Sequence, residues 1–128
     1  MKVSILGNGL TSLALAKSLV NQGIKVDIFS EQKIKNNNKI QTLGISKSNI
    51  EFFNENILDI KKFLWNINKI EIFSENLENE KILNFQKNNQ YLFSIIRNFD
   101  LYNYLSFNLD KNKLVKFRKK IDYNDSLK

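Results

Sequence analysis

Two glycines stand one residue apart directly after a short apolar run, and this feature restricts the fold of the 128-residue chain more than any other. The residues from Lys2 to Leu6 read KVSIL, and Gly7 and Gly9 follow them, although the whole sequence holds only four glycines. A short apolar run that ends at glycine is typical of a buried strand. The glycines then allow a tight turn out of that strand.

The residues after the glycine pair predict a helix and a second strand. Apolar and small residues recur at helical spacing from Leu10 to Val20, and Gly23 in the tripeptide NQG suits a left-handed cap at the end of such a helix. Strand character resumes from Ile24 to Phe29. About thirty residues is the length of one parallel crossover. The sequence therefore predicts an α/β fold with a Rossmann-like βαβ unit over residues 2–31.

The glycine pair also fits the pattern G-x-G-x-x-G/A of dinucleotide-binding turns. In that pattern the first glycine makes the turn, the second lets a pyrophosphate approach the backbone, and the third position keeps helix and strand close. Gly7 and Gly9 fill the first two places, and Ser12 replaces the third. The amides of Leu10, Thr11 and Ser12 would point at the phosphates from the helix start. We therefore expect an adenosine diphosphate site here.

An acidic residue completes this pattern. The dinucleotide-binding turn requires a carboxylate at the end of the second strand, about 20 residues on, to bond a ribose hydroxyl. Glu31 follows the segment VDIFS at that distance. The alternative interpretation is a structural βαβ corner in which the glutamate is only solvated.

The rest of the chain predicts further helices and a small hairpin. A polar loop with three consecutive asparagines covers residues 31–41. A helix capped by Ser46 or Ser48 is expected to keep its apolar spacing as far as Leu64. The other expected elements are a hairpin of strands 69–75 and 80–86, a helix from Asn98 to Leu109, and either a strand or a frayed tail over 113–120.

The composition narrows the possible chemistry. The sequence has no cysteine and no histidine, which excludes disulfides, Cys/His zinc sites and catalytic triads that need either residue. No segment reaches the ~18 apolar residues that a membrane span requires, so the chain is expected to be cytoplasmic. Any catalytic chemistry must therefore come from carboxylates, lysine and arginine, hydroxyls, backbone amides or a bound cofactor.

The formal net charge of +7 is interpreted as a compositional bias. Lysine accompanies many asparagines and isoleucines, and the three residue types share A/T-rich codons. We therefore expect lysines spread over several faces and no nucleic-acid partner, although a basic face can neutralise phosphates.

Three segments together resemble a known family. SILGNGLTSLALAKSLVNQGIKVDIFSE, IQTLGISKSNIEFF and SIIRNFDLYNYL follow one another in this order. They resemble the N-terminal part of FAD-dependent aromatic-ring hydroxylases, most closely the ubiquinone-biosynthesis hydroxylases related to para-hydroxybenzoate hydroxylase. The resemblance extends over about residues 2–110.

The resemblance implies FAD as cofactor, NAD(P)H as its reductant and a prenylated phenol as substrate. It implies that Gly7, Gly9 and Ser12 hold the pyrophosphate and that Glu31 holds the adenosine ribose. Gln41 stands where the family has an arginine close to the FAD phosphates, so one cationic contact is missing. Arg97 matches a family position near the ribityl chain. The resemblance implies no catalytic side chain and no metal ligand within these residues.

The family's members are several times longer than this sequence. They carry a second FAD motif and a substrate domain, neither of which is found before Lys128. We therefore expect residues 1–128 to be the N-terminal portion of an FAD-binding domain, with a C-terminal part as a missing partner. A prenylated substrate is also compatible with peripheral association at a membrane.

Two other classes remain open. One is a fragment of an NAD(P)-binding Rossmann oxidoreductase, because Glu31 suits NAD as well as FAD. Such an enzyme would be expected to continue with regular alternation of strands and helices, and the segment IQTLGISKSNIEFF, which contains Gln41, does not fit that alternation. The other is a non-catalytic basic domain that binds RNA or a protein partner. The aromatic residues lie at core spacing rather than in a stacking ladder, which argues against RNA.

Overall fold

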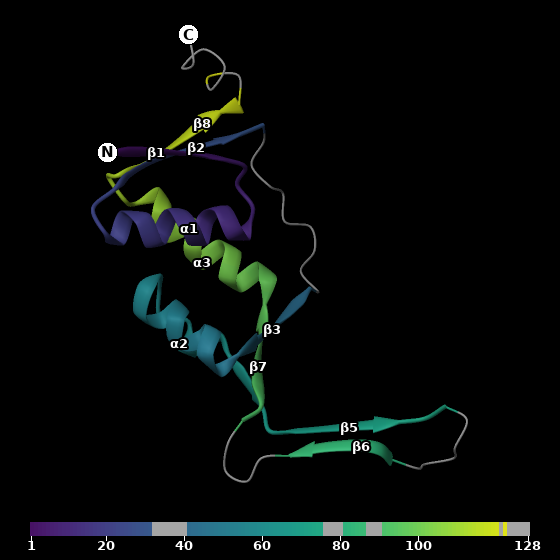
Figure 1. Cartoon of the computed structure of the whole chain (residues 1–128). Coiled ribbons are helices and arrows are strands. Elements are labelled where there is room, and N and C mark those ends of the chain that lie inside the picture. Colours follow the sequence, from purple (N-terminus) through teal and green to yellow (C-terminus); the bar gives the residue numbers. More distant parts are fainter. Residues whose placement is uncertain (32–40, 76–80, 87–90, 121, 123–128) are drawn as a thin grey trace.

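A three-stranded parallel sheet forms one end of the molecule in a computed structural model, which describes residues 1–31, 41–75, 81–86, 91–120 and 122. Its strands lie in the order β1–β2–β8, with β2 in the centre. Helices α1 and α3 lie on the same side of this sheet (Figure 1). The bounds are β1 Lys2–Leu6, α1 Leu10–Asn21, β2 Lys25–Ser30, α3 Asn98–Asp110 and β8 Val115–Lys119.

A second sheet, antiparallel, has the strand order β3–β7–β4. Strand β7 leads directly into α3, so this sheet is joined to the helix layer of the first. Helix α2 follows β3, and a single 3₁₀ turn precedes β4. The bounds are β3 Thr42–Ser46, α2 Lys47–Asn56, η1 Lys61–Phe63, β4 Trp65–Ile67 and β7 Phe93–Arg97.

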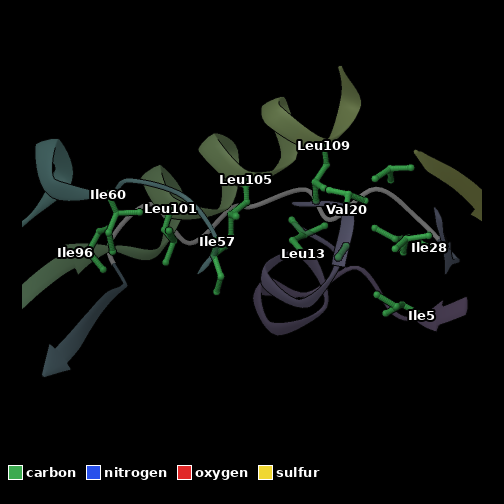
Figure 2. Packing of buried hydrophobic residues seen from close by; sticks show 13 residues of the cluster. Ile5, Leu13, Val20, Ile28, Ile57, Ile60, Ile96, Leu101, Leu105 and Leu109 are labelled. Atoms are coloured by element: carbon green, nitrogen blue, oxygen red, sulfur yellow. The ribbon is translucent and has the colours of Figure 1, made fainter. Parts of the chain in front are cut away.

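One continuous apolar core connects the two sheets through α3. Figure 2 shows the buried side chains as a row that runs from Ile5 and Ile28 of the parallel sheet to Ile96 of the antiparallel sheet. Leu105 lies within this row and has no exposed surface, because α1, α3 and the segment after α2 enclose it. Helix α3 therefore fixes the position of β7 relative to the strands that carry the glycine turn.

Strands β5 (Lys69–Phe73) and β6 (Lys81–Gln86) form a two-stranded ribbon that projects away from both sheets (Figure 1). The antiparallel register places Ile72 opposite Leu83, and Phe85 lies on the same face. These three side chains are 42%, 49% and 50% exposed, respectively. A two-stranded ribbon by itself is marginally stable in water, and an exposed apolar face of this kind is typical of an interaction surface.

The polar face of the parallel sheet surrounds one buried carboxylate. Strand alternation places Asp27 on the face opposite to the helices, and it is only 4% exposed. Its Oδ2 accepts hydrogen bonds from Lys2 Nζ at 2.6 Å and from Arg118 Nε at 2.9 Å. Burial alone would raise the pKa of Asp27, but the hydrogen bond from Lys2 and the charges of Arg118 and Lys2 outweigh it and hold this pKa below its ordinary value.

The predicted α/β fold class and the βαβ unit are confirmed. The hairpin and the helix that begins at Asn98 are also confirmed, and residues 113–120 contain strand β8 rather than a frayed tail. The cap at Ser46 is confirmed by the hydrogen bond that its Oγ accepts from the Asn49 amide. Gly23 adopts the expected left-handed conformation, with φ +78°. Residues 32–40 of the expected polar loop and the hairpin turn lie outside the described residues.

One prediction about the middle of the chain was wrong, and one sheet was missed. Helix α2 ends at Asn56 rather than at Leu64, because the Asn54 side chain accepts the Ile60 amide at 2.9 Å and the backbone turns away after Ile57. The second sheet was not predicted, because its three short strands pair across long stretches of sequence. No helix that the structure describes is long and apolar enough to cross a membrane.

Candidate functional site

A pocket of about 550 Å³ lies where the parallel strands β1 and β2 end. Ligands of open α/β sheets bind at this carboxyl edge, where the strand-to-helix turns meet. The pocket has the size of a small-molecule site. Its lining consists of Leu6, Gly7, Asn8, Phe29, Ser30, Glu31 and Lys120. The structure therefore brings Gly7 and Asn8 of the glycine turn and the predicted ribose carboxylate into one pocket, whereas Gly9 and residues 10–12 are not among its lining residues.

Gly7 is required by the fold itself. Its φ is +104°, a conformation that L-residues with a side chain rarely adopt. Its amide donates to the carbonyl oxygen of Phe29 at 2.8 Å, which ties the turn to the end of the neighbouring strand. The Oγ of Ser12 would lie 3.6 Å from a Cβ placed on Gly7, so the small residue at position 12 leaves room for the turn.

Gly9 is not required by the fold. It is the N-cap residue of α1 with φ −70°, which any residue can adopt, and a Cβ placed on it would meet nothing within 4 Å. No side chain caps this helix start, and the first turn has no acidic residue. The first amides of a helix have no intrahelical acceptor, so those of Leu10, Thr11 and Ser12 are suited to an anion. A pyrophosphate can approach this open turn, and the residues present fit the cofactor expected from the sequence.

Tyr102 holds the turn from the other side. Its hydroxyl donates to the carbonyl oxygen of Asn8 at 3.0 Å, which connects α3 to the residue between the two glycines. Burial, with a smaller effect from the Asp110 charge, raises the pKa of Tyr102, so the hydroxyl stays protonated and able to donate. The sequence analysis did not identify Tyr102, because it follows Asn8 by 94 positions and carries no motif of its own.

Glu31 and Lys120 face each other at the edge of the pocket. Lys120 Nζ donates to Glu31 Oε1 at 2.9 Å, and both side chains are mostly exposed. The hydrogen bond from Lys120 and its positive charge lower the pKa of Glu31. The sequence analysis did not identify Lys120 as a site residue either. A parallel pairing of residues 113–120 with the second strand would have placed it there.

Gln41 and Arg97 lie apart from the pocket lining, beside the start of α3. The Gln41 carbonyl oxygen accepts the Asn98 amide at 2.9 Å, and the adjacent Thr42 pairs with Arg97. The Arg97 guanidinium lies over the Trp65 ring, 4.9 Å from its centroid. The structure thus brings these two residues together at the antiparallel sheet. Their contacts with a cofactor stay predictions.

Solved structures share this fold. PqsL, a probable FAD-dependent monooxygenase from Pseudomonas aeruginosa, matches 94% of this chain with a TM-score of 0.73 and 17% identity. The p-nitrophenol 4-monooxygenase PnpA from Pseudomonas putida matches 93% with a TM-score of 0.73 and 16% identity. HpxO from Klebsiella pneumoniae, in complex with FAD and uric acid, matches 91% with a TM-score of 0.68 and 15% identity. No protein-family model and no curated protein matches the sequence.

The matches cover only part of the solved proteins. This chain spans 33% of PqsL, 32% of PnpA and 30% of HpxO. At these identities the likeness concerns the fold. The chain therefore shares its fold with about a third of the polypeptide of PqsL and of PnpA.

Proposed function

We propose that this chain binds the adenosine diphosphate part of FAD and contributes it to a flavin-dependent aromatic-ring hydroxylase. The observation that carries the proposal is the open space at Gly9. Neither the backbone nor the described packing of the chain requires glycine there, and a group that approaches from outside the chain would account for it. The unpaired amides at the start of α1 and the Glu31 carboxylate at the end of β2 support the proposal, because such groups bind a pyrophosphate and its ribose in dinucleotide-binding turns.

FAD supplies the redox chemistry in such an enzyme, and the protein binds and orients it. In this chain the turn from Gly7 to Ser12 would hold the pyrophosphate, and Tyr102 would keep that turn in place through Asn8. Glu31 would accept hydrogen bonds from the adenosine ribose, with Lys120 keeping it ionised. NAD(P)H as reductant and a prenylated phenol of ubiquinone biosynthesis as substrate are the finer parts of the proposal. They are supported by the sequence resemblance alone.

The contacts to the flavin ring and the substrate are proposed to come from further polypeptide. The solved structures are about three times as long as the part that this chain matches. The apolar face of the ribbon formed by β5 and β6, with Leu83 and Phe85 half exposed, offers a surface on which such a polypeptide could pack. PnpA and the oxygenase of 2-methyl-3-hydroxypyridine-5-carboxylic acid, which matches 93% of this chain, are both named for aromatic substrates.

Replacing Glu31 with glutamine is expected to weaken FAD binding roughly ten- to a hundredfold. A carboxylate that accepts ribose hydroxyls makes charge-assisted hydrogen bonds, which are stronger than neutral ones but are weakened by solvent at an exposed site. Fluorescence titration of the chain with FAD measures the change. Glu55→Gln on α2 is the matched control, because it removes the same charge from an exposed site outside the pocket. Equal FAD affinity of the Glu31 variant and the wild type would mean that Glu31 is only solvated.

Replacing Lys120 with glutamine is expected to shift the acid limb of FAD binding to higher pH. Binding requires ionised Glu31, and Lys120 lowers the pKa of that carboxyl below its ordinary value of 4.5. Affinity should therefore persist to lower pH in the wild type and decline nearer pH 4.5 in the variant. FAD titrations between pH 3.5 and 7, in roughly half-unit steps, measure this shift. Superimposable pH profiles would contradict the role of Lys120.

A further inference from the structure

A second pocket, of about 340 Å³, lies at the opposite end of the parallel sheet from the FAD site. Lys2 and Lys25 begin β1 and β2 and pair with each other in register. Lys116 lies near the start of β8 and pairs with Asp27. Lys113 and Leu114, in the turn between α3 and β8, complete the lining. Four lysines from three different segments therefore surround one depression.

The turn that carries Lys113 is held in place by the chain itself. The Asn112 Oδ1 accepts the Leu114 amide at 2.9 Å, and the Leu114 carbonyl oxygen accepts the Val26 amide at 2.8 Å. These bonds tie the turn to the central strand. The lysine positions around the pocket are thus set by regular strand pairing and by a fixed turn.

The negative charge in this pocket is already balanced. Asp27 is bonded to Lys2 and to Arg118, so its carboxylate has two cationic partners. No residue that the structure describes forms an ion pair with Lys25, Lys113 or Lys116. Several ammonium groups around one concave site raise the local positive potential above that of a flat lysine-bearing surface. An anion that enters this pocket would supply the missing negative charge.

We propose that this pocket binds a compact anion that carries several phosphate groups. Lysine ammonium groups are point charges that suit phosphate oxygens without requiring a planar partner. Among the described residues of the lining, Leu114 is the one apolar residue and the other five carry charged groups, so an anion in the pocket would meet several cationic side chains. The ligand is therefore recognised by its phosphates.

The competing explanation is the base-composition bias of the sequence, which would place lysines without regard to a ligand. The two explanations differ in how much lysines outside the pocket contribute to anion binding. Under the bias, any three exposed lysines contribute equally to the weak attraction of anions, and salt screens that attraction. Under the proposal, only the lysines of the pocket matter.

The test is calorimetric titration of the chain with inorganic triphosphate at about 0.15 M salt, where exposed charges are largely screened. One variant carries Lys25→Gln, Lys113→Gln and Lys116→Gln. The matched control carries Lys47→Gln, Lys61→Gln and Lys62→Gln, which removes the same charge from exposed positions on α2 and the 3₁₀ turn. The Lys62 ammonium lies over the Phe63 and Tyr104 rings, so circular dichroism of both variants must first show that they stay folded.

Saturable binding to the wild type that is weakened at least tenfold in the pocket variant, and less than twofold in the control, supports the proposal. Three outcomes overturn it: no saturable binding to the wild type, equal weakening in both variants, or unchanged binding in the pocket variant. The last would place triphosphate at the glycine turn or elsewhere. FAD affinity should be the same in the pocket variant and the wild type, so the result is independent of the proposed function.

Discussion

Replacing Gly9 with valine is expected to abolish FAD binding while the chain stays folded. A valine side chain at this position would occupy the space through which a pyrophosphate reaches the amides at the start of α1. Two lost hydrogen bonds to a charged group correspond to about 3–6 kcal/mol, or at least about a hundredfold in affinity. The φ of −70° allows a side chain, and a Cβ placed on Gly9 would meet no described atom within 4 Å. The free energy of unfolding should therefore change by no more than about 1 kcal/mol.

A second variant, Gly9→Ser, separates a loss of FAD affinity from a loss of stability. Serine is a preferred N-cap residue, so it should hold or raise the stability of α1. Its side chain would still narrow the approach to the turn and weaken FAD binding. Stability and affinity would then change in opposite directions, which a general loss of structure cannot produce. Circular dichroism and FAD titration on both variants measure the two quantities, and undiminished FAD affinity in Gly9→Val would overturn the assignment of the turn.

Replacing Leu105 with alanine is expected to destabilise the whole chain by about 2–5 kcal/mol. Leu105 is fully buried on α3, within the cluster that joins the two sheets. Truncation leaves a cavity in that cluster, and the loss is a large fraction of the roughly 5–15 kcal/mol by which domains are stable. Urea unfolding followed by circular dichroism measures the change.

Phe107→Ala provides the control on the same helix. Phe107 is 58% exposed, with the Lys111 ammonium over its ring, so its removal should cost less than about 1 kcal/mol. Similar losses in both variants would mean that α3 does not connect the two sheets through a common core.

The βαβ unit could be predicted because its signals are local. Strand, turn and helix follow one another within residues 2–31, and the φ of Gly7 and Gly23 agrees with the turns that the sequence indicated. The antiparallel sheet could not be predicted in the same way. Strands β3 and β7 pair over a long separation, and nothing within either segment indicates its partner.

The candidate site was predictable to the same degree. Gly7 and Glu31, which line the pocket, could be identified because their spacing with Gly9 forms a pattern within one supersecondary unit, while the contacts of all three with a cofactor stay predictions. Tyr102 and Lys120 could not, since their partners lie 94 and 89 positions earlier in the chain. The end of α2 was missed for a different reason: the Asn54 side chain competes for a backbone amide, and apolar spacing does not reveal this.

The most direct test of the central claim is a titration of the isotopically labelled chain with FAD, followed by amide resonances in two-dimensional NMR spectra. The account predicts saturable shifts that are largest for Gly7, for the amides from Gly9 to Ser12, and for Glu31. The lysine pocket that contains Lys113 should be unaffected. Saturable shifts centred on that pocket, or no saturable shifts at the glycine turn, would contradict the claim that this turn binds the cofactor.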